Sequence, residues 1–302
     1  MADGLLLIRK DAGPTSNGVL GRLKARLGTR DLGHGGTLDS FATGLLPVFL
    51  GEGLKLSRFF LESHPTLPTY WKSYRATMKL GVATAALDPT TEVTERAPVP
   101  ILTTEGLETL LQNFRGTAYE QMPPTYSAKK IAGKRASDLV REGEKVELSP
   151  QRVEIRGLEG RIANADEIEF SVTCSKGTYV RALARDLAAR LGTVAHLTKL
   201  ERTAVGNFRV EDADCVDEAE VRLGAQGFLD LSSLCSATLP SHIVCADDAA
   251  HLIAGRGAMV LNKLKDLAPS PYYAKMANGT PIALIEVSES TARLLRCFRL
   301  AG

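Results

Sequence analysis

The sequence predicts an α+β protein with two domains: a large one of mixed strands and helices, residues 1–240, and a small, mainly β one, residues 241–302. Apolar and polar residues alternate over two segments of the large domain, which is the spacing of half-buried strands. Over two other segments, apolar residues recur at the spacing of an amphipathic helix. An acidic stretch, residues 211–230, then marks the approach to the domain boundary.

The N-terminal part of the large domain supplies a strand, a helix and a glycine-rich loop. A short apolar run at 5–9 predicts the strand. Ser16 is the expected N-cap of a helix that ends at Gly28, because apolar residues follow Ser16 at helical spacing. The glycine-rich loop, 33–44, then precedes an apolar stretch at 45–50.

The same two patterns continue through the rest of the large domain. A helix is expected through residues 54–61, and strict alternation predicts a strand over 74–82. Residues 168–174 predict a second strand. An apolar stripe over 180–191 predicts a helix that closes at Gly192.

A long polar and basic segment, residues 119–150, interrupts these elements. It is expected to leave the domain core and to hold a short helix at 136–142, because excursions of this length are usually functional or disordered. In the small domain, the sequence predicts a helix at 247–254 and strands at 281–287 and 295–300.

Composition favours a soluble cytoplasmic protein. Hydrophobic residues make up 44% of the chain and the formal net charge is +2, while no apolar run approaches the roughly 20 residues of a membrane span. The N-terminus lacks the layout of a signal or transit peptide. The five cysteines, an odd number without a C-x-x-C pair, are expected to be free thiols of a reducing compartment.

The small net charge hides a segregation along the chain. Residues 172–202 carry six Lys and Arg against two acids, residues 210–250 carry one against nine, and residues 251–302 carry seven against three. Charge sorted in this way favours an anionic partner on particular faces. An unevenly charged solvated surface explains the pattern equally well, so composition permits a nucleic-acid partner without naming one.

The glycine-rich loop contains one carboxylate, Asp39. Glycines allow positive φ and close backbone approach, so the loop can present Asp39 on an exposed turn. A turn former or helix cap is the commoner role for such an aspartate. The loop has neither the G-x-x-x-x-G-K-[ST] nor the G-x-G-x-x-G pattern of a phosphate-binding loop.

Two further stretches, 175–186 and 74–76, attract attention. Arg181 and Arg185 are four residues apart near the start of the predicted helix, where cations oppose the helix macrodipole. Both face solvent in the simplest interpretation, which we favour for Arg185. Tyr74 lies on the apolar face of its strand, where an aromatic residue is usually part of the core.

Taken together, these stretches resemble the bacterial TruB family of tRNA pseudouridine synthases along almost the whole chain. The matching segments are Lys10, 33–44, 123–130 with 133–136, 174–181, 196–197 and 200–206. The resemblance implies a pseudouridine synthase catalytic domain, with an RNA-gripping thumb at about 121–150. The small domain is similar to the family's PUA-like RNA-binding domain, with a weaker match.

The resemblance also implies roles for individual residues. Asp39 is expected to be the nucleophile, Tyr74 to stack on the target base and help remove its C5 proton, and Arg181 to pair with the Asp39 carboxylate. The expected substrate-site residues are Lys10, which supports the site, His34, which helps hold the nucleotide, Tyr74, Tyr179 and Leu200. The expected RNA-binding residues are Lys129, Lys130, Lys134, Arg135 and Lys176. For Leu200, the pocket and the core remain comparable interpretations.

The implied reaction isomerises uridine 55 of tRNA, in the loop of the T-arm, after the base has flipped out of its stack. It breaks an N-glycosidic bond and makes a C–C bond without redox change, so no metal or organic cofactor is expected. Three mechanisms stay open: the carboxylate adds to the base, it attacks the sugar, or it assists formation of a glycal intermediate. Each needs an ionised Asp, which a neighbouring Arg favours. The implied partner is the tRNA T-arm stem-loop. We expect a cytoplasmic monomer with no membrane attachment and no obligatory protein partner.

The chain departs from the family pattern at four places. Gly35 stands where the family usually has Thr, Ser40-Phe41 where it has Pro-Leu, and Thr84-Ala85-Ala86 where it has Thr-Asp-Thr. A few extra residues, around 64–71, precede Tyr74. No catalytic group is lost, but loop rigidity is brought into question.

Three alternative functions compete with this interpretation. The first is a tRNA-binding chaperone with dispensable catalysis, against which the joint presence of Asp39, Tyr74 and Arg181 argues. The second is the guide-RNA-dependent relative, which acts with partner proteins, whereas the thumb-like segment favours the stand-alone bacterial type. The third, an unrelated phosphate-binding enzyme, lacks every supporting motif.

Overall fold

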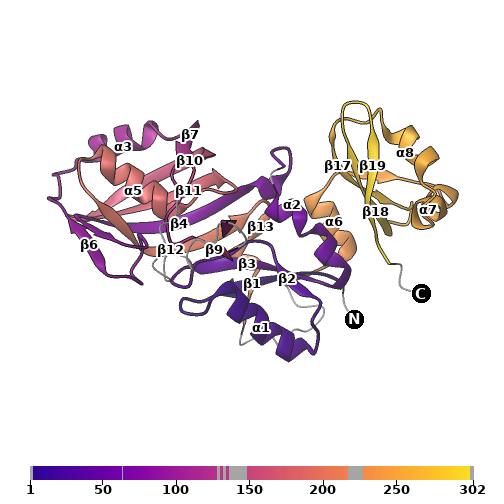
Figure 1. Ribbon diagram of the computed structural model, residues 1–302, viewed down its shortest axis with the longest axis horizontal. Helices are drawn as coiled ribbons and strands as arrows, with labels where there is room; N and C mark the ends of the chain where they lie inside the picture. Colours follow the sequence, from indigo (N-terminus) through magenta and orange to yellow (C-terminus); the bar gives the residue numbers. More distant parts are fainter. Residues whose placement is uncertain are drawn as a thin grey trace.

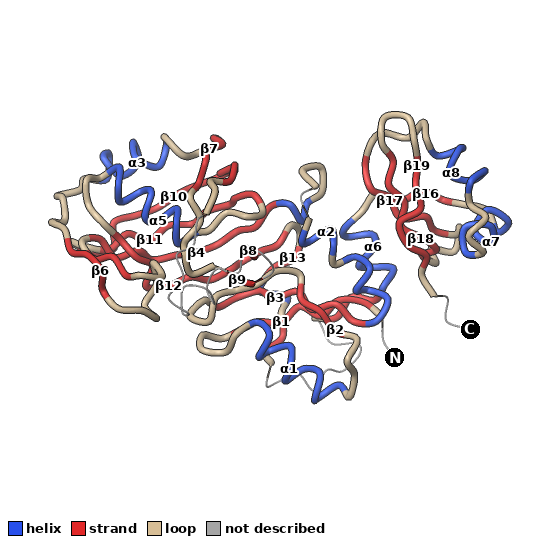
Figure 2. Tube along the Cα trace, in the orientation of Figure 1, coloured by secondary structure: helices blue, strands red, loops and turns tan. Residues whose placement is uncertain are grey.

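The computed structural model of the chain describes residues 3–62, 64–127, 130–131, 134–135, 148–216 and 227–299. Within them, a large mixed sheet with helices on its faces precedes a small sheet built from the C-terminal residues, as Figures 1 and 2 show. The predicted α+β class is therefore confirmed.

The large sheet contains eleven strands among the described residues. Across the sheet these are β14 (Asp214–Cys215), β1 (Gly4–Lys10), β3 (Thr43–Leu50), β12 (Ala195–Val205), β4 (Trp71–Leu80), β11 (Glu167–Ser175), β10 (Gln151–Asn164) and β7 (Thr117–Gln121). Three short strands pair beside β3, β12 and β1: β2 (Leu32–His34), β13 (Phe208–Arg209) and β15 (Phe228–Asp230). Because β3 pairs in parallel with β12, the glycine-rich loop that enters β3 lies beside the middle of the sheet.

Two helices pack over the β4 side of the sheet and bury its apolar face (Figure 1). They are α3 (Thr104–Gln112) and α5 (Val180–Arg190). The predicted alternation on β4 is confirmed, since Met78 and Leu80 are buried while Arg75 is exposed. Full burial of one such apolar side chain stabilises the fold by about 1.5–3 kcal/mol.

Helix α1 (Ser16–Leu27) packs against β1–β3 and ends, as predicted, at Gly28, which has φ +60°. The predicted N-cap is wrong by one residue: the Thr15 side chain accepts the hydrogen bond from the Gly18 N–H, and Ser16 is 2% exposed. Ser16 is instead used by the glycine-rich loop, as described below.

The helix predicted through 54–61 is broken into a 3₁₀ helix, η1 (Gly51–Leu56), and a single turn, α2 (Arg58–Leu61). Within η1 the chain approaches β1 closely, since a β-carbon on Gly53 would lie 2.1 Å from the carbonyl oxygen of Gly4. A second 3₁₀ turn, η2 (Pro68–Tyr70), leads into β4.

The part of 119–150 that the structure describes is less irregular than predicted. Residues 119–121 belong to β7, and two-residue strands β8 (Lys130–Ile131) and β9 (Lys134–Arg135) pair as a hairpin. The helix predicted at 136–142 lies outside the described residues. Another small hairpin joins β5 (Val82–Thr84) to β6 (Val93–Arg96), so the strand predicted over 74–82 stops at Leu80.

The C-terminal residues form a four-stranded sheet in the order of the chain. Its strands are β16 (Ser241–Ile243), β17 (Ser270–Lys275), β18 (Pro281–Val287) and β19 (Ala292–Cys297), accompanied by α7 (Ala246–Ile253) and α8 (Ala258–Leu264). The last strand begins three residues earlier than predicted. A 3₁₀ turn, η3 (Val210–Asp212), lies between β13 and β14 of the large sheet. Helix α6 (Leu231–Thr238) connects the two sheets, and Tyr273 and Phe298 pack into the core beside it. The boundary at 240/241 stays a prediction.

None of the helices in the described residues is long and apolar enough to span a membrane.

Candidate active site

The loop between β2 and β3 carries Asp39, and three buried side chains hold the backbone of this loop. Nζ of Lys10 donates to the carbonyls of Ser40 (3.2 Å) and Ala42 (2.6 Å), and also to that of Asp11 (2.9 Å). Lys10 is 0% exposed, so it holds the loop from the protein interior.

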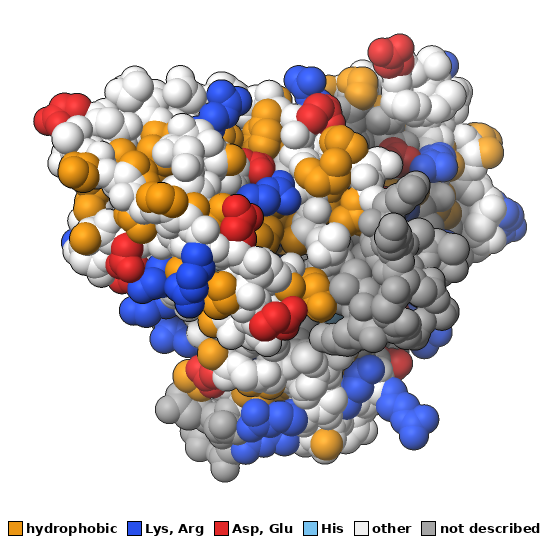
Figure 3. Space-filling view, turned by 60° about the vertical axis from the view of Figure 1, so that its left-hand side comes forward, with side chains coloured by type: hydrophobic (Ala, Val, Ile, Leu, Met, Phe, Trp, Pro, Cys, Tyr) orange, Lys and Arg blue, Asp and Glu red, His pale blue; other side chains and the backbone are white. Residues whose placement is uncertain are grey.

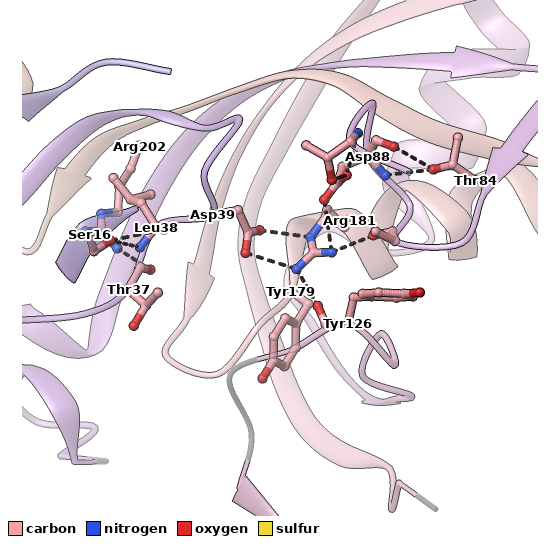
Figure 4. Close-up of polar contacts among 12 residues, drawn as sticks. Ser16, Thr37, Leu38, Asp39, Thr84, Asp88, Tyr126, Tyr179, Arg181 and Arg202 are labelled. Atoms are coloured by element: carbon pink, nitrogen blue, oxygen red, sulfur yellow. Dashed lines mark hydrogen bonds and ion pairs between the residues drawn. The ribbon is translucent and has the colours of Figure 1, made fainter. Parts of the chain in front are cut away.

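The other two anchors lie on either side. The Ser16 hydroxyl donates to the Leu38 carbonyl (3.0 Å) and accepts from the Leu38 N–H (2.8 Å), fixing the residue before Asp39 (Figure 4). The Arg202 guanidinium, on β12, donates to the carbonyls of Gly36 (3.1 Å), Thr37 (3.4 Å) and Leu45 (2.8 Å). All three anchors bind main-chain atoms.

Two glycines allow this packing. Gly44 has φ +103°, and a β-carbon there would lie 2.3 Å from the carbonyl oxygen of Arg202, so only glycine lets β3 meet β12 here. Gly36 has φ +138° and faces Lys72 and Arg202. The glycines thus fix how the loop sits on the sheet.

Asp39 forms a two-oxygen ion pair with Arg181, the second residue of α5. Oδ2 lies 2.9 Å from Nε and Oδ1 lies 3.0 Å from Nη2 (Figure 4). The Asp39 side chain keeps 38% of its surface exposed, whereas that of Arg181 is 4% exposed. A fixed cation therefore orients a carboxylate that solvent or a substrate can still reach.

Arg181 is held from its far side by a second carboxylate, Asp88. Nη1 of Arg181 lies 3.2 Å from Oδ2 of Asp88 and donates to the Ala86 carbonyl at 2.5 Å, and Nη2 donates to the Tyr126 carbonyl at 2.9 Å. Asp88 in turn accepts from the N–H and hydroxyl of Thr90. The buried Arg181 is thus balanced by two carboxylates, which explains a cation in the first turn of a helix.

The protonation of Asp39 depends on two opposed effects. Burial raises the pKa of Asp39 above its ordinary value, while the guanidinium of Arg181 lowers it. Lys10 lowers it too, and burial lowers the pKa of Lys10 to about 8. Arg181 and Lys10 are the groups that favour the ionised carboxylate.

Tyr74 lies on β4 within the same core cluster as Leu38, and is 9% exposed. Burial raises the pKa of Tyr74 to about 12, although Arg202 lowers it. The phenol is therefore neutral near neutral pH. The phenol can accept a proton from the target nucleobase only after it has lost its own hydroxyl proton.

The other predicted substrate-site residues are Tyr179, His34 and Leu200. Tyr179 caps the start of α5, donating its N–H to Oε1 of Gln121 (2.8 Å), and burial raises its side-chain pKa. Nδ1 of His34 accepts from the Gly36 N–H at 3.4 Å. Leu200 is 7% exposed and belongs to the main core cluster. It also lines a groove of about 880 Å³ beside β4, so both of its interpretations stay open.

The predicted RNA-binding cations are only partly described. Lys176 lies in the turn between β11 and α5 and is partly exposed, with its N–H bonded to the Tyr70 carbonyl at 2.8 Å. Lys130, Lys134 and Arg135 lie in the β8–β9 hairpin. Lys129 is outside the described residues. Arg185, expected to face solvent, is half-buried and pairs with Asp186 at 2.8 Å.

Gly35 is not a point of added freedom. A β-carbon there would lie 3.0 Å from Phe49 and 3.2 Å from Phe60, two rings in edge contact. Phe60 therefore occupies the space beside Gly35. The absent proline at Ser40 is offset, since the Ser40 carbonyl accepts from Lys10 and from the Gly13 N–H (2.8 Å).

Known proteins resemble this chain in sequence. The family model described as TruB family pseudouridylate synthase, N-terminal domain, matches residues 24–180. The tRNA pseudouridine synthase B of Francisella philomiragia is 42% identical over 212 residues, 70% of this chain and 68% of that protein. The protein of the same name from Nitrosococcus oceani is 36% identical over 294 residues, 97% of this chain and 87% of that protein.

Solved structures resemble it in fold. A chain of a Cbf5–Nop10–Gar1 complex has a TM-score of 0.72 at 19% identity, covering 99% of this chain and 85% of that one. A chain of an H/ACA RNP bound to a substrate RNA containing 2′-deoxyuridine has a TM-score of 0.67 at 18% identity, covering 98% and 85%. At these identities the likeness concerns the fold alone.

Proposed function

Because the chain belongs to the TruB family of pseudouridylate synthases, we propose that it converts uridine 55 in the T-arm loop of tRNA to pseudouridine, with Asp39 as the nucleophile. The observation that carries the proposal is the partly exposed carboxylate of Asp39 held through both oxygens by the buried Arg181. The sequence relatives named above are tRNA pseudouridine synthases.

The chemistry follows from this pair. The reaction breaks the N1–C1′ bond of uridine, rejoins C1′ to C5 and releases the C5 proton to solvent. An ionised Asp39 either adds to the base or sugar or assists removal of the C2′ proton on the way to a glycal. Arg181 keeps the carboxylate ionised and aimed, so that no reorientation is needed in the transition state.

Tyr74 supplies an apolar ring beside Asp39. Flipping a base costs about a few kcal/mol of stacking, part of which an aromatic side chain returns. Because the Tyr74 phenol is neutral near neutral pH, we assign it ring stacking first. Removal of the C5 proton by Tyr74 requires that the phenol first transfer its own proton.

The surface supports an anionic partner. On the face drawn in Figure 3, Lys and Arg side chains gather in patches over the lower half, while acidic side chains lie singly. Contacts from such cations to phosphates position RNA without reading its sequence. We propose that the chain acts as a cytoplasmic monomer, without a cofactor or an obligatory protein partner, and recognises the folded T-arm mainly by shape.

The test is tritium release from an unmodified tRNA transcript that carries 5-tritiated uridine. Wild type should release tritium and leave pseudouridine at position 55, and Asp39→Asn should release none while still binding the RNA. A transcript with cytidine at position 55 is the matched control and should release none. If wild type binds the transcript without releasing tritium, the catalytic proposal fails and the chaperone alternative replaces it.

A further inference from the structure

A second cation beside the Asp39 loop has no part in the reaction described above. Lys72 precedes Tyr74 by two residues on β4, so the two side chains share one face of the strand. A β-carbon built on Gly36 would lie 3.1 Å from Nζ of Lys72 and 3.6 Å from Nη1 of Arg202. Two cations therefore converge on the turn three residues before Asp39.

No carboxylate contacts Lys72 in the part of the chain that the structure describes. Its Nζ has neither a hydrogen-bond nor an ion-pair partner there. The partners of the Arg202 guanidinium are main-chain carbonyls and the Tyr74 phenol, all neutral. Lys176, on the neighbouring turn, adds a third positive charge.

Electrostatics give this cluster a cost in the free protein. Burial first, and then the charge of Arg202, lower the pKa of Lys72 to about 7; the thiol of Cys174 raises it, and the charge of Lys176 lowers it further. A charge that is partly withdrawn from water is unfavourable unless a counter-charge arrives. Lys72 and Lys176 are both only partly buried, so an anion can reach them from solvent.

We infer that Lys72, with Lys176 beside it, binds a backbone phosphate that flanks the isomerised uridine. The inference rests on the proposed function, since a flipped nucleotide brings a phosphodiester on each side into the site. A lysine ammonium is a compact charge that binds phosphate from many directions. Such a contact holds the nucleotide in place and reads no sequence.

The first measurement is RNA binding by Lys72→Met. Affinity should fall roughly tenfold to a hundredfold, as for the loss of a hydrogen bond between charged groups. The slope of log affinity against log salt should become shallower by about 0.7–0.9. Lys72→Arg should keep most of the affinity. The matched control is Lys79→Met on the same strand, because Lys79 is already paired with Asp166 at 3.0 Å, and it should bind like wild type.

The second measurement removes the phosphate charge instead of the lysine. A transcript with uncharged methylphosphonate linkages on both sides of the target uridine should bind wild type as weakly as the normal transcript binds Lys72→Met. Lys72→Met should lose nothing further on this RNA. If the two losses add, or if Lys72→Met binds the normal RNA like wild type, the inference is wrong. Both experiments measure RNA binding, so they are independent of the tritium-release assay. Absence of tritium release by wild type would contradict only the proposed reaction.

Discussion

Arg181 bonds two carboxylates, and the isosteric changes Asp88→Asn and Asp39→Asn should separate stability from catalysis. The side chains of Arg181 and Asp88 are 4% and 6% exposed, so water replaces little of the lost interaction. Hydrogen bonds to charged groups contribute about 1.5–3 kcal/mol, and we expect Asp88→Asn to lower the free energy of unfolding by about 2–3 kcal/mol. Asp39 is 38% exposed, so water replaces part of the interaction that Asp39→Asn removes, and we expect a smaller loss of stability than for Asp88→Asn.

The order reverses for turnover. Asp39→Asn removes the proposed nucleophile and should abolish tritium release. Asp88→Asn leaves Asp39 in place but frees Arg181 to shift, and a displacement of about 1 Å can cost on the order of a hundredfold in rate. Urea unfolding followed by the fluorescence of Trp71, the one tryptophan, reports on β4 and supplies the stability arm.

The control is Asp166→Asn, which breaks a surface pair with Lys79 whose side chains are 40% and 38% exposed. It should change neither measurement. Equal destabilisation by Asp39→Asn and Asp88→Asn would refute the assignment of one carboxylate to stability and the other to chemistry. So would an Asp88→Asn protein that is as stable and as fast as wild type.

Three further outcomes follow from the site. Burial raises the pKa of Asp39, and the proposed reaction requires the ionised carboxylate, so single-turnover tritium release should fall as the pH drops through that raised pKa. Arg181 lowers the pKa of Asp39, so Arg181→Gln should move this fall in rate to higher pH. Gly35→Thr should destabilise the protein by about 1–3 kcal/mol through overpacking against Phe60, and Phe60→Leu in the same chain should restore part of the loss, as thermal unfolding would reveal. Ser16→Ala leaves a buried N–H before Asp39 without a partner, which costs about 1–3 kcal/mol; kcat should fall with KM little changed, and an unaltered kcat would contradict the anchoring role.

Local patterns predicted the elements whose environment is simple. The strands at β4 and β11 and the helices α1 and α5 have one buried face each, so their periodicity was readable. The long strands β10 and β12 were missed. On β12, exposed or half-buried Lys199 and Glu201 alternate with buried Leu200 and Arg202. Because one of the buried positions holds a charged arginine, the sequence does not show the apolar–polar alternation of a strand.

The site was predicted as far as the family resemblance reached. That resemblance is confirmed, and the expected Asp39–Arg181 pair is present. Asp88 was missed because an aspartate in a Thr-rich turn looks like any turn former, and its partner lies 93 residues away. A signal was nonetheless available: a cation in the first turn of a helix needs a counter-charge. No pattern in the sequence distinguishes Lys72 from other lysines on strands. Only the structure does so, because it places Nζ of Lys72 close to Gly36.

The way the Asp39 loop is fastened has a consequence for mutational tolerance. Lys10, Ser16 and Arg202 all bind main-chain groups of the loop: carbonyls, which every amino acid supplies, and one N–H, which every amino acid except proline supplies. Replacement of the Ser40 or Phe41 side chain therefore leaves these hydrogen bonds in place. A library randomised at these two positions should retain many active clones, whereas one randomised at the three fastening residues should retain few.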